Sequence, residues 1–120
     1  MILSIVTINL NKIAGLRRTI QSLMPARLSL SYEHILIDGG SDDGSVEVAT
    51  RSGIFDLIIS EADSGIYSAM NKGASTSSGE YLLFLNSGDE LYSTHLLQDS
   101  MLYLETNKVD IYSLSCIVCC

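Results

Sequence analysis

Three short apolar segments of this chain each end abruptly in polar residues. They cover residues 2–8, 34–37 and 81–85. A continuous apolar run of this length is typical of a strand buried on both faces of a sheet. The segments between them carry apolar residues at helical spacing. Because strands that alternate with helices form βαβ units with right-handed crossovers, the chain is predicted to fold as an α/β domain with a mostly parallel sheet.

The same patterns place the individual elements. Strands are expected at 2–8, 34–37, 55–59, 81–85 and 109–112. Helices are expected at 13–24, 46–52, 66–74 and 93–106. Pro25 is the only proline. We expect it to end the first helix, because proline lacks the N–H that continues the helical hydrogen bonds.

Polar clusters follow three of the predicted strands. They lie at 7–9, 38–41 and 86–89. The carboxyl ends of parallel strands meet at one edge of the sheet, where open α/β sheets bind their ligands. We therefore expect the three clusters to converge into one binding site.

Composition limits the class of protein. The chain has 120 residues, of which 47% are hydrophobic and 18% are charged, so it is long and apolar enough for one globular domain. The net charge of −7 argues against general nucleic-acid binding. It suits an acidic site that needs a cation, although an acidic surface that aids solubility is an equally good explanation. No apolar run approaches the roughly 20 residues of a membrane span, and no basic segment precedes the short apolar start, so we expect a cytoplasmic protein.

Asp38 and Asp89 are the candidates for ligand contact. Asp38 closes a strand and precedes two glycines, so its carboxylate can accept hydrogen bonds from a base or a ribose. A turn-forming aspartate is the equally weighted alternative. Asp89 follows Gly88 after a buried strand, where a carboxylate suits Mg²⁺ or Mn²⁺ with a phosphorylated ligand. A simple Gly-Asp turn is the alternative there.

Other motifs have simpler explanations. Asp42, Asp43 and Asp63 precede predicted helices and are expected to cap them. Cys116 and Cys119 have the spacing of half a zinc site, but no second half follows, so these cysteines and Cys120 are expected to be ordinary tail residues. Neither a P-loop nor a G-x-G-x-x-G motif is present, which disfavours a P-loop NTPase and a dinucleotide site.

Four segments in order resemble the family 2 glycosyltransferases, which have the GT-A fold. Residues 4–12 resemble the opening of that family, and Ile-Asp-Gly-Gly-Ser-Asp-Asp-Gly-Ser at 37–45 is similar to its "VDGGSTDGT" element. Residues 63–73 resemble the "DxGIYDAMNKG" element of the colanic-acid-type transferases, a bacterial polysaccharide-synthesis branch. Residues 84–89 resemble that branch's version of the DxD motif.

The resemblance implies a nucleotide-sugar donor, in the first place a UDP-sugar, a divalent cation (Mn²⁺ or Mg²⁺), and a glycan or lipid-linked acceptor. It also allows for peripheral attachment at the inner membrane. By the match, Thr7 and Asn9 line the base pocket and Asp38 holds the base. Asp63 and Asn71 border the nucleotide, Asn86 lies near the ribose or sugar, and Asp89 binds the metal.

The chain departs from the family pattern in several places. Asn86 and Gly88 stand where the commoner motif has acidic residues, and Ser68 stands where the branch has aspartate. Family members also continue further, with an acceptor site and a catalytic base. We therefore expect a partial donor-binding domain over 1–113 and an aberrant or frayed tail over 114–120, as in a truncated or frameshifted reading frame, and we assign no catalytic base. A nucleotide-sugar-binding fragment without turnover is the alternative function, and an unrelated receiver-like α/β domain is less favoured.

Overall fold

The molecule is built on a parallel sheet, as predicted. The structure is a computed structural model that describes residues 2–107 and 118–119. The four strands stand in the order β3-β2-β1-β4, and all three pairings are parallel. Their bounds are Leu3–Asn9 for β1, Glu33–Asp38 for β2, Leu57–Ser60 for β3 and Tyr81–Phe84 for β4.

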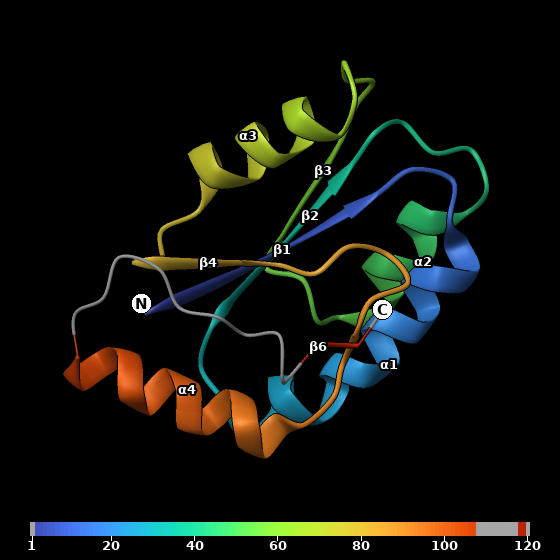
Figure 1. The fold of residues 1–120 in the computed structure, drawn as a ribbon. Helices are drawn as coiled ribbons and strands as arrows, with labels where there is room; N and C mark the ends of the chain where they lie inside the picture. The colour runs from blue at the N-terminus through green and yellow to red at the C-terminus, as the bar shows by residue number, and fades with distance from the viewer. Residues whose placement is uncertain (1, 108–117, 120) are drawn as a thin grey trace.

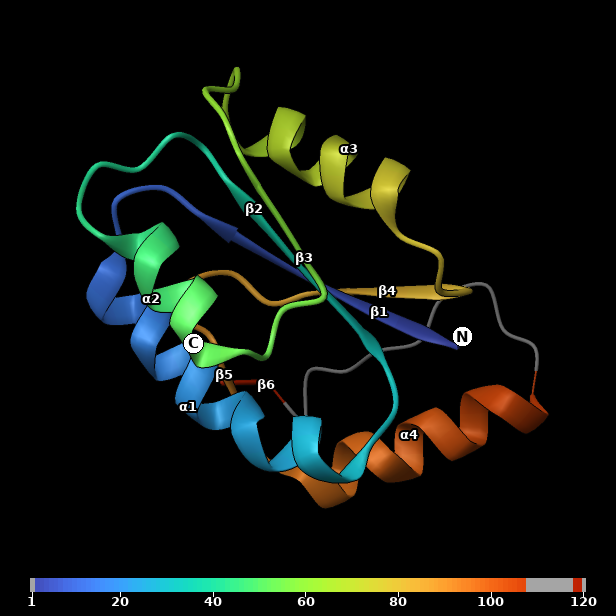
Figure 2. The same ribbon diagram turned by 180° about the vertical axis from the view of Figure 1, so that it is seen from behind.

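Helices cover both faces of this sheet (Figure 1). They are α1 (Ile13–Ser29), α2 (Ser45–Ser52), α3 (Ile66–Thr76) and α4 (Thr94–Thr106). The view from behind shows α1 and α2 side by side, with α3 on the opposite face of the sheet (Figure 2). This arrangement leaves the carboxyl ends of the strands together at one edge.

Alternate residues of the central strands enter two different cores. Leu3 and Ile5 of β1 belong to the larger core, which α1, α2 and α4 close. Val6 lies on the other face with Ile35 and Ile37, under α3. Burial on both faces is the reason why the strands appear as uninterrupted apolar runs in the sequence.

The first helix does not end at Pro25, so that prediction is wrong. Pro25 lies inside α1, which continues to Ser29. The ring is exposed, while Leu23 and Ala26 on either side are buried in the core. Packing of these neighbours holds the helix together although proline contributes no N–H to it.

A small antiparallel pair was not predicted. Strand β5 (Glu90–Leu91) pairs with β6 (Val118–Cys119). The predicted strand at 109–112 lies outside the described residues, as do Cys116 and Cys120. Within the described part of the chain, none of the helices has the length and apolar character needed to cross a membrane.

Candidate functional site

Asn9 joins the carboxyl ends of three strand segments. Its side chain is 2% exposed. Its Nδ2 donates to Asp38 Oδ1 at the end of β2, at 2.9 Å. Its Oδ1 accepts from Ser87 Oγ in the loop after β4, at 2.6 Å. The predicted convergence of the three polar clusters is therefore confirmed.

The Asp38 carboxylate is fully buried and accepts hydrogen bonds from three directions. The donors are Asn9 Nδ2, Gly40 N, Ser41 N, Ser41 Oγ and Ser60 Oγ. Burial opposes ionisation, but the bonds from Ser41, Asn9 and Ser60 outweigh it and hold the pKa of Asp38 below its usual value. Asp38 thus organises the turn that follows β2, in which Gly40 has a φ of 91°. Its predicted contact with a base stays a prediction.

The loop after β4 is a tight turn fixed to α1. Asn86 N donates to Asp89 Oδ2 at 3.0 Å, and Asp89 N donates to Asn86 O at 2.9 Å. Gly88 has a φ of 101°, which a side chain would strain. The Thr19 hydroxyl accepts from Gly88 N at 3.0 Å and donates to Asp89 O at 2.7 Å. The Gly-Asp turn is real, and it presents a half-buried carboxylate.

Two oxygens of this turn have the chemistry that a divalent cation prefers, although one of them is buried. Asp89 Oδ1 has no hydrogen bond among the described residues, and Asn86 Oδ1 is buried without a partner. Both are hard oxygen ligands, which Mg²⁺ and Mn²⁺ prefer. The described residues contain no cluster of three or more acidic, histidine or cysteine side chains. Such a cation would therefore complete its coordination with phosphate oxygens and water, as Mg²⁺ does in nucleotide sites.

Asp63 and Asn71 lie on the α3 side of the same edge. Asp63 does not cap α3, so that expectation is wrong; its Oδ1 accepts from Gly65 N in the preceding turn, at 3.1 Å. A Cβ built on Gly39 would lie 3.4 Å from Asp63 Oδ2, so this carboxylate lies against the turn after β2. Asn71 is exposed on α3 and lines a hollow with Lys72. Lys72 is paired with Glu61 at 3.1 Å.

The side chain of Thr7 does not reach the carboxyl edge of the sheet. The residue is fully buried, and its hydroxyl lies 2.9 Å from His34 Nε2. Its predicted role in lining the base pocket stays a prediction.

Asp43 caps two helices at once. Its Oδ2 accepts from Ile13 N at the start of α1, and its Oδ1 accepts from Ser45 N at the start of α2, both at 3.0 Å. The capping prediction is thus confirmed for Asp43. It is wrong for Asp42, which instead donates its own backbone N–H to Asn11 Oδ1.

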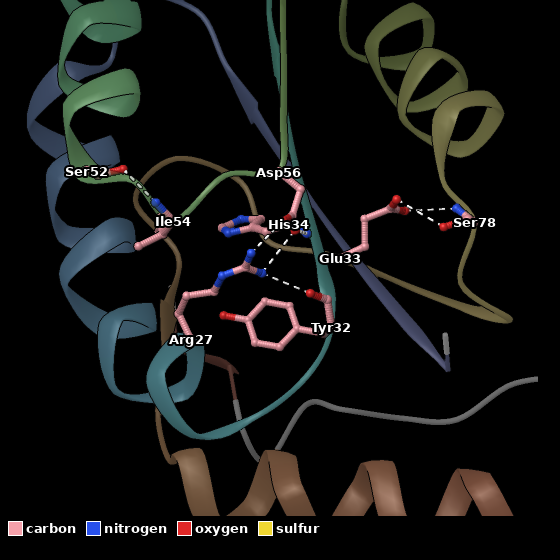
Figure 3. Close-up of polar contacts among 8 residues, drawn as sticks. All are labelled: Arg27, Tyr32, Glu33, His34, Ser52, Ile54, Asp56 and Ser78. Carbon is pink, nitrogen blue, oxygen red and sulfur yellow. Dashed lines mark hydrogen bonds and ion pairs between the residues drawn. The ribbon is translucent and has the colours of Figure 1, made fainter.

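A second polar cluster lies at the amino ends of β2 and β3 (Figure 3). Arg27 Nη1 donates to Asp56 Oδ2 at 3.0 Å and to Tyr32 O at 2.9 Å. Asp56 Oδ2 also accepts from His34 N. These contacts lie at the end of the sheet away from Asp38 and Asp89, and they link α1 to the start of the strands.

The model of glycosyl transferase family 2 matches residues 4–120. The chain belongs to this family. An uncharacterised glycosyltransferase of Mycobacterium tuberculosis is 45% identical over 89 residues, which is 72% of this chain and 33% of the relative. The chain therefore spans about a third of the length of this curated relative.

Solved structures share the fold. Staphylococcus aureus TarS 1–349, solved in complex with UDP-GlcNAc, superposes with a TM-score of 0.75 over 88% of this chain and 32% of its own, at 18% identity. Glucosyl-3-phosphoglycerate synthase of M. tuberculosis, in complex with Mn²⁺, UDP and glucosyl-3-phosphoglycerate, gives a TM-score of 0.70 at 23% identity, over 89% of this chain and 40% of its own. The sheet of this chain is therefore the GT-A, Rossmann-like N-terminal half of such enzymes.

Proposed function

We propose that the carboxyl edge of the sheet binds a UDP-sugar together with Mn²⁺ or Mg²⁺. The hydrogen bonds that bring Asn9, Asp38 and the 86–89 turn together support this proposal most directly. In the whole protein, the sugar would pass to a glycan or lipid-linked acceptor in polysaccharide synthesis. The 63–73 segment favours the colanic-acid-type branch, and such an acceptor favours attachment at the inner membrane.

The chain's own residues bind and orient the donor. Asp38 would hold the base beside Asn9 through the turn that its five hydrogen bonds organise, and Thr7 would support this side of the base pocket from within β1. Asp63 and Asn71 border the nucleotide from the α3 side. Asn86 lies at the ribose or sugar, and Asp89 holds the cation.

A cation bound at Asp89 would offset the charge that develops on the departing diphosphate. The turn and Thr19 hold Asp89 in place for this role without a ligand. The acceptor hydroxyl would attack the anomeric carbon with a general base, which we do not assign in this chain.

Calorimetric titration of the protein with UDP tests the site. We expect binding with Mn²⁺ to be at least about tenfold tighter than in EDTA, because a cation held by Asp89 would offset the negative charge of the phosphates. Asp89→Asn keeps the size of the side chain and removes its charge, so affinity in Mn²⁺ should fall to the EDTA level. Asp99→Asn, on the exposed side of α4, is the matched control and should behave like the wild type. Equal UDP affinity with and without Mn²⁺ would contradict the assigned role of Asp89.

A further inference from the structure

The unpaired cations of the described chain all lie on one surface. Arg27 is paired with Asp56, and Lys72 with Glu61. The other described cations form no ion pair and are exposed. They are Lys12, Arg17, Arg18 and Arg51. We call these four residues, together with the outward side of α1, the basic face.

The basic face is continuous across α1 and α2, which lie side by side (Figures 1 and 2). Arg17 of α1 and Arg51 of α2 line the same hollow between the two helices. Lys12 and Arg18 line the next hollow, at the start of α1. The face therefore presents four positive charges along neighbouring ridges.

Acidic residues are sparse on this surface although the chain as a whole carries a net charge of −7. The 17 residues of α1 include no aspartate or glutamate. Asp42, Asp43 and Glu47 lie at the start of α2, and Asp89 lines the hollow of Lys12 and Arg18, whereas no acidic residue lines the hollow of Arg17 and Arg51. The hollow of Arg17 and Arg51 is therefore the positively charged part of the basic face, and negative charges more distant than a Debye length of roughly 8 Å are screened from it at physiological salt.

Exposed apolar side chains continue the same side of α1. Met24 is 40% exposed and Leu28 is 87% exposed. Residues 17, 21, 24 and 28 follow a spacing of four, three and four, which places them on one side of a helix. The outward side of α1 therefore changes from arginine at residue 17 to exposed apolar side chains at residues 24 and 28, over a length of roughly 17 Å.

We propose that the basic face docks on an anionic lipid bilayer. A bilayer offers phosphate headgroups to the arginines and acyl chains to Met24 and Leu28, which is the combination that interfacial helices recognise. A nucleic acid offers only the charge.

Docking in this way would bring the donor site to the bilayer. Lys12 and Arg18 share their hollow with Gly88 and Asp89. A lipid-linked acceptor would then reach the cation-binding turn from the membrane side. This consequence rests on the proposed function, whereas the docking itself depends only on α1 and α2.

Sedimentation with vesicles tests the proposal. The protein, without nucleotide or Mn²⁺, is mixed with vesicles of phosphatidylglycerol and phosphatidylcholine, or of phosphatidylcholine alone. We expect it to sediment with the anionic vesicles only. Salt at roughly 0.5 M should release it, because the ions screen the attraction between the protein and the lipid headgroups. Arg17→Gln with Arg51→Gln should weaken binding by roughly thirtyfold, because each surface cation contributes about fivefold.

Two further variants separate the contributions. Met24→Ser with Leu28→Ser should also weaken binding, and these exposed positions leave the fold intact, as a thermal melt would confirm. Gln98→Glu with Thr94→Glu lowers the net charge by the same amount on α4 and should bind like the wild type. No binding to anionic vesicles, or equal loss in the α4 control, would overturn the proposal and point to an acidic protein partner or to net charge alone. Because no nucleotide is present, neither result alters the outcome of the UDP titration.

Discussion

A single carboxylate can have both of the roles that its sequence context leaves open. Asp38 forms the turn after β2, as a turn aspartate does, and it also lies at the edge where the donor is proposed to bind. Its donors come from β1, from the turn itself and from the end of β3. A site residue held from three sides keeps its orientation without the ligand, which is how binding geometry is preorganised.

Because Asp38 accepts all of these hydrogen bonds, Asp38→Asn tests how much this one carboxylate stabilises the fold. The substitution places an NH₂ group against N–H and O–H donors, so we expect a loss of about 3 kcal/mol in unfolding free energy. The pKa of Asp38 is lowered in the folded state, so its stabilisation is present above the unfolded pKa and is lost as the pH falls through the folded pKa. Urea unfolding at pH 7 and pH 3 measures both effects.

The neighbouring Asp42 provides the matched control for this test. It is exposed, and Asp42→Asn should change the unfolding free energy by about 0.5 kcal/mol or less. A similar loss for both variants would show that the Asp38 network does not stabilise the fold.

The residue scale also shows where prediction from sequence stops. Asp38 and Asp89 stand out because each follows an apolar run and is next to or near glycine. Thr19 does not stand out, although its hydroxyl fixes the turn at Gly88, a residue 69 positions away in the chain. Such a contact depends on the tertiary packing of α1 against the loop, and no local pattern indicates it.

At the scale of elements, a glycine allows α3 to pack closely against the sheet. A Cβ on Gly73 would lie 2.4 Å from Val6 Cγ1, so only glycine permits this approach. Gly73→Ala should push the helix outward and cost about 1–3 kcal/mol in unfolding free energy. Chemical denaturation measures the loss, with Ser75→Ala on the exposed side of α3 as control.

A second substitution identifies the cause of that loss. Val6→Ala removes the clashing methyl groups, so Gly73→Ala should cost much less in this background than in the wild type. Additive losses in the double variant would mean that helix propensity or another contact, and not the approach to Val6, is responsible.

Elements were predictable where their periodicity was strong. Each described strand of the parallel sheet and each helix appears within a few residues of its expected place, because one or both faces pack against a core. The prediction that Pro25 ends the first helix was wrong because tertiary packing outweighs local propensity. The β5–β6 pair was missed because two-residue strands carry no period.

At the scale of the whole molecule, the two ends of the sheet have different polar chemistry. The carboxyl end gathers ionised and amide groups near the surface. The amino end encloses His34, which is fully buried. Its Nε2 is bonded to the Thr7 hydroxyl, and its Nδ1 has no partner among the described residues. Burial, reinforced by the positive charge of Arg27, lowers the pKa of His34 to about 3 (Figure 3). This neutral ring makes global stability depend on pH.

The direction of this pH dependence follows from the linkage between proton binding and unfolding. His34 titrates near its ordinary value of 6.5 in the unfolded chain and at about 3 in the folded one, so protons bind the unfolded state first as the pH falls. Unfolding free energy should therefore drop by about 2 kcal/mol between pH 8 and pH 5. Urea denaturation at both pH values measures it. His34→Gln should be less stable overall but nearly flat over this range, whereas His95→Gln, at an exposed site on α4, should keep the wild-type slope. A slope that survives His34→Gln would place the titrating group elsewhere in the molecule.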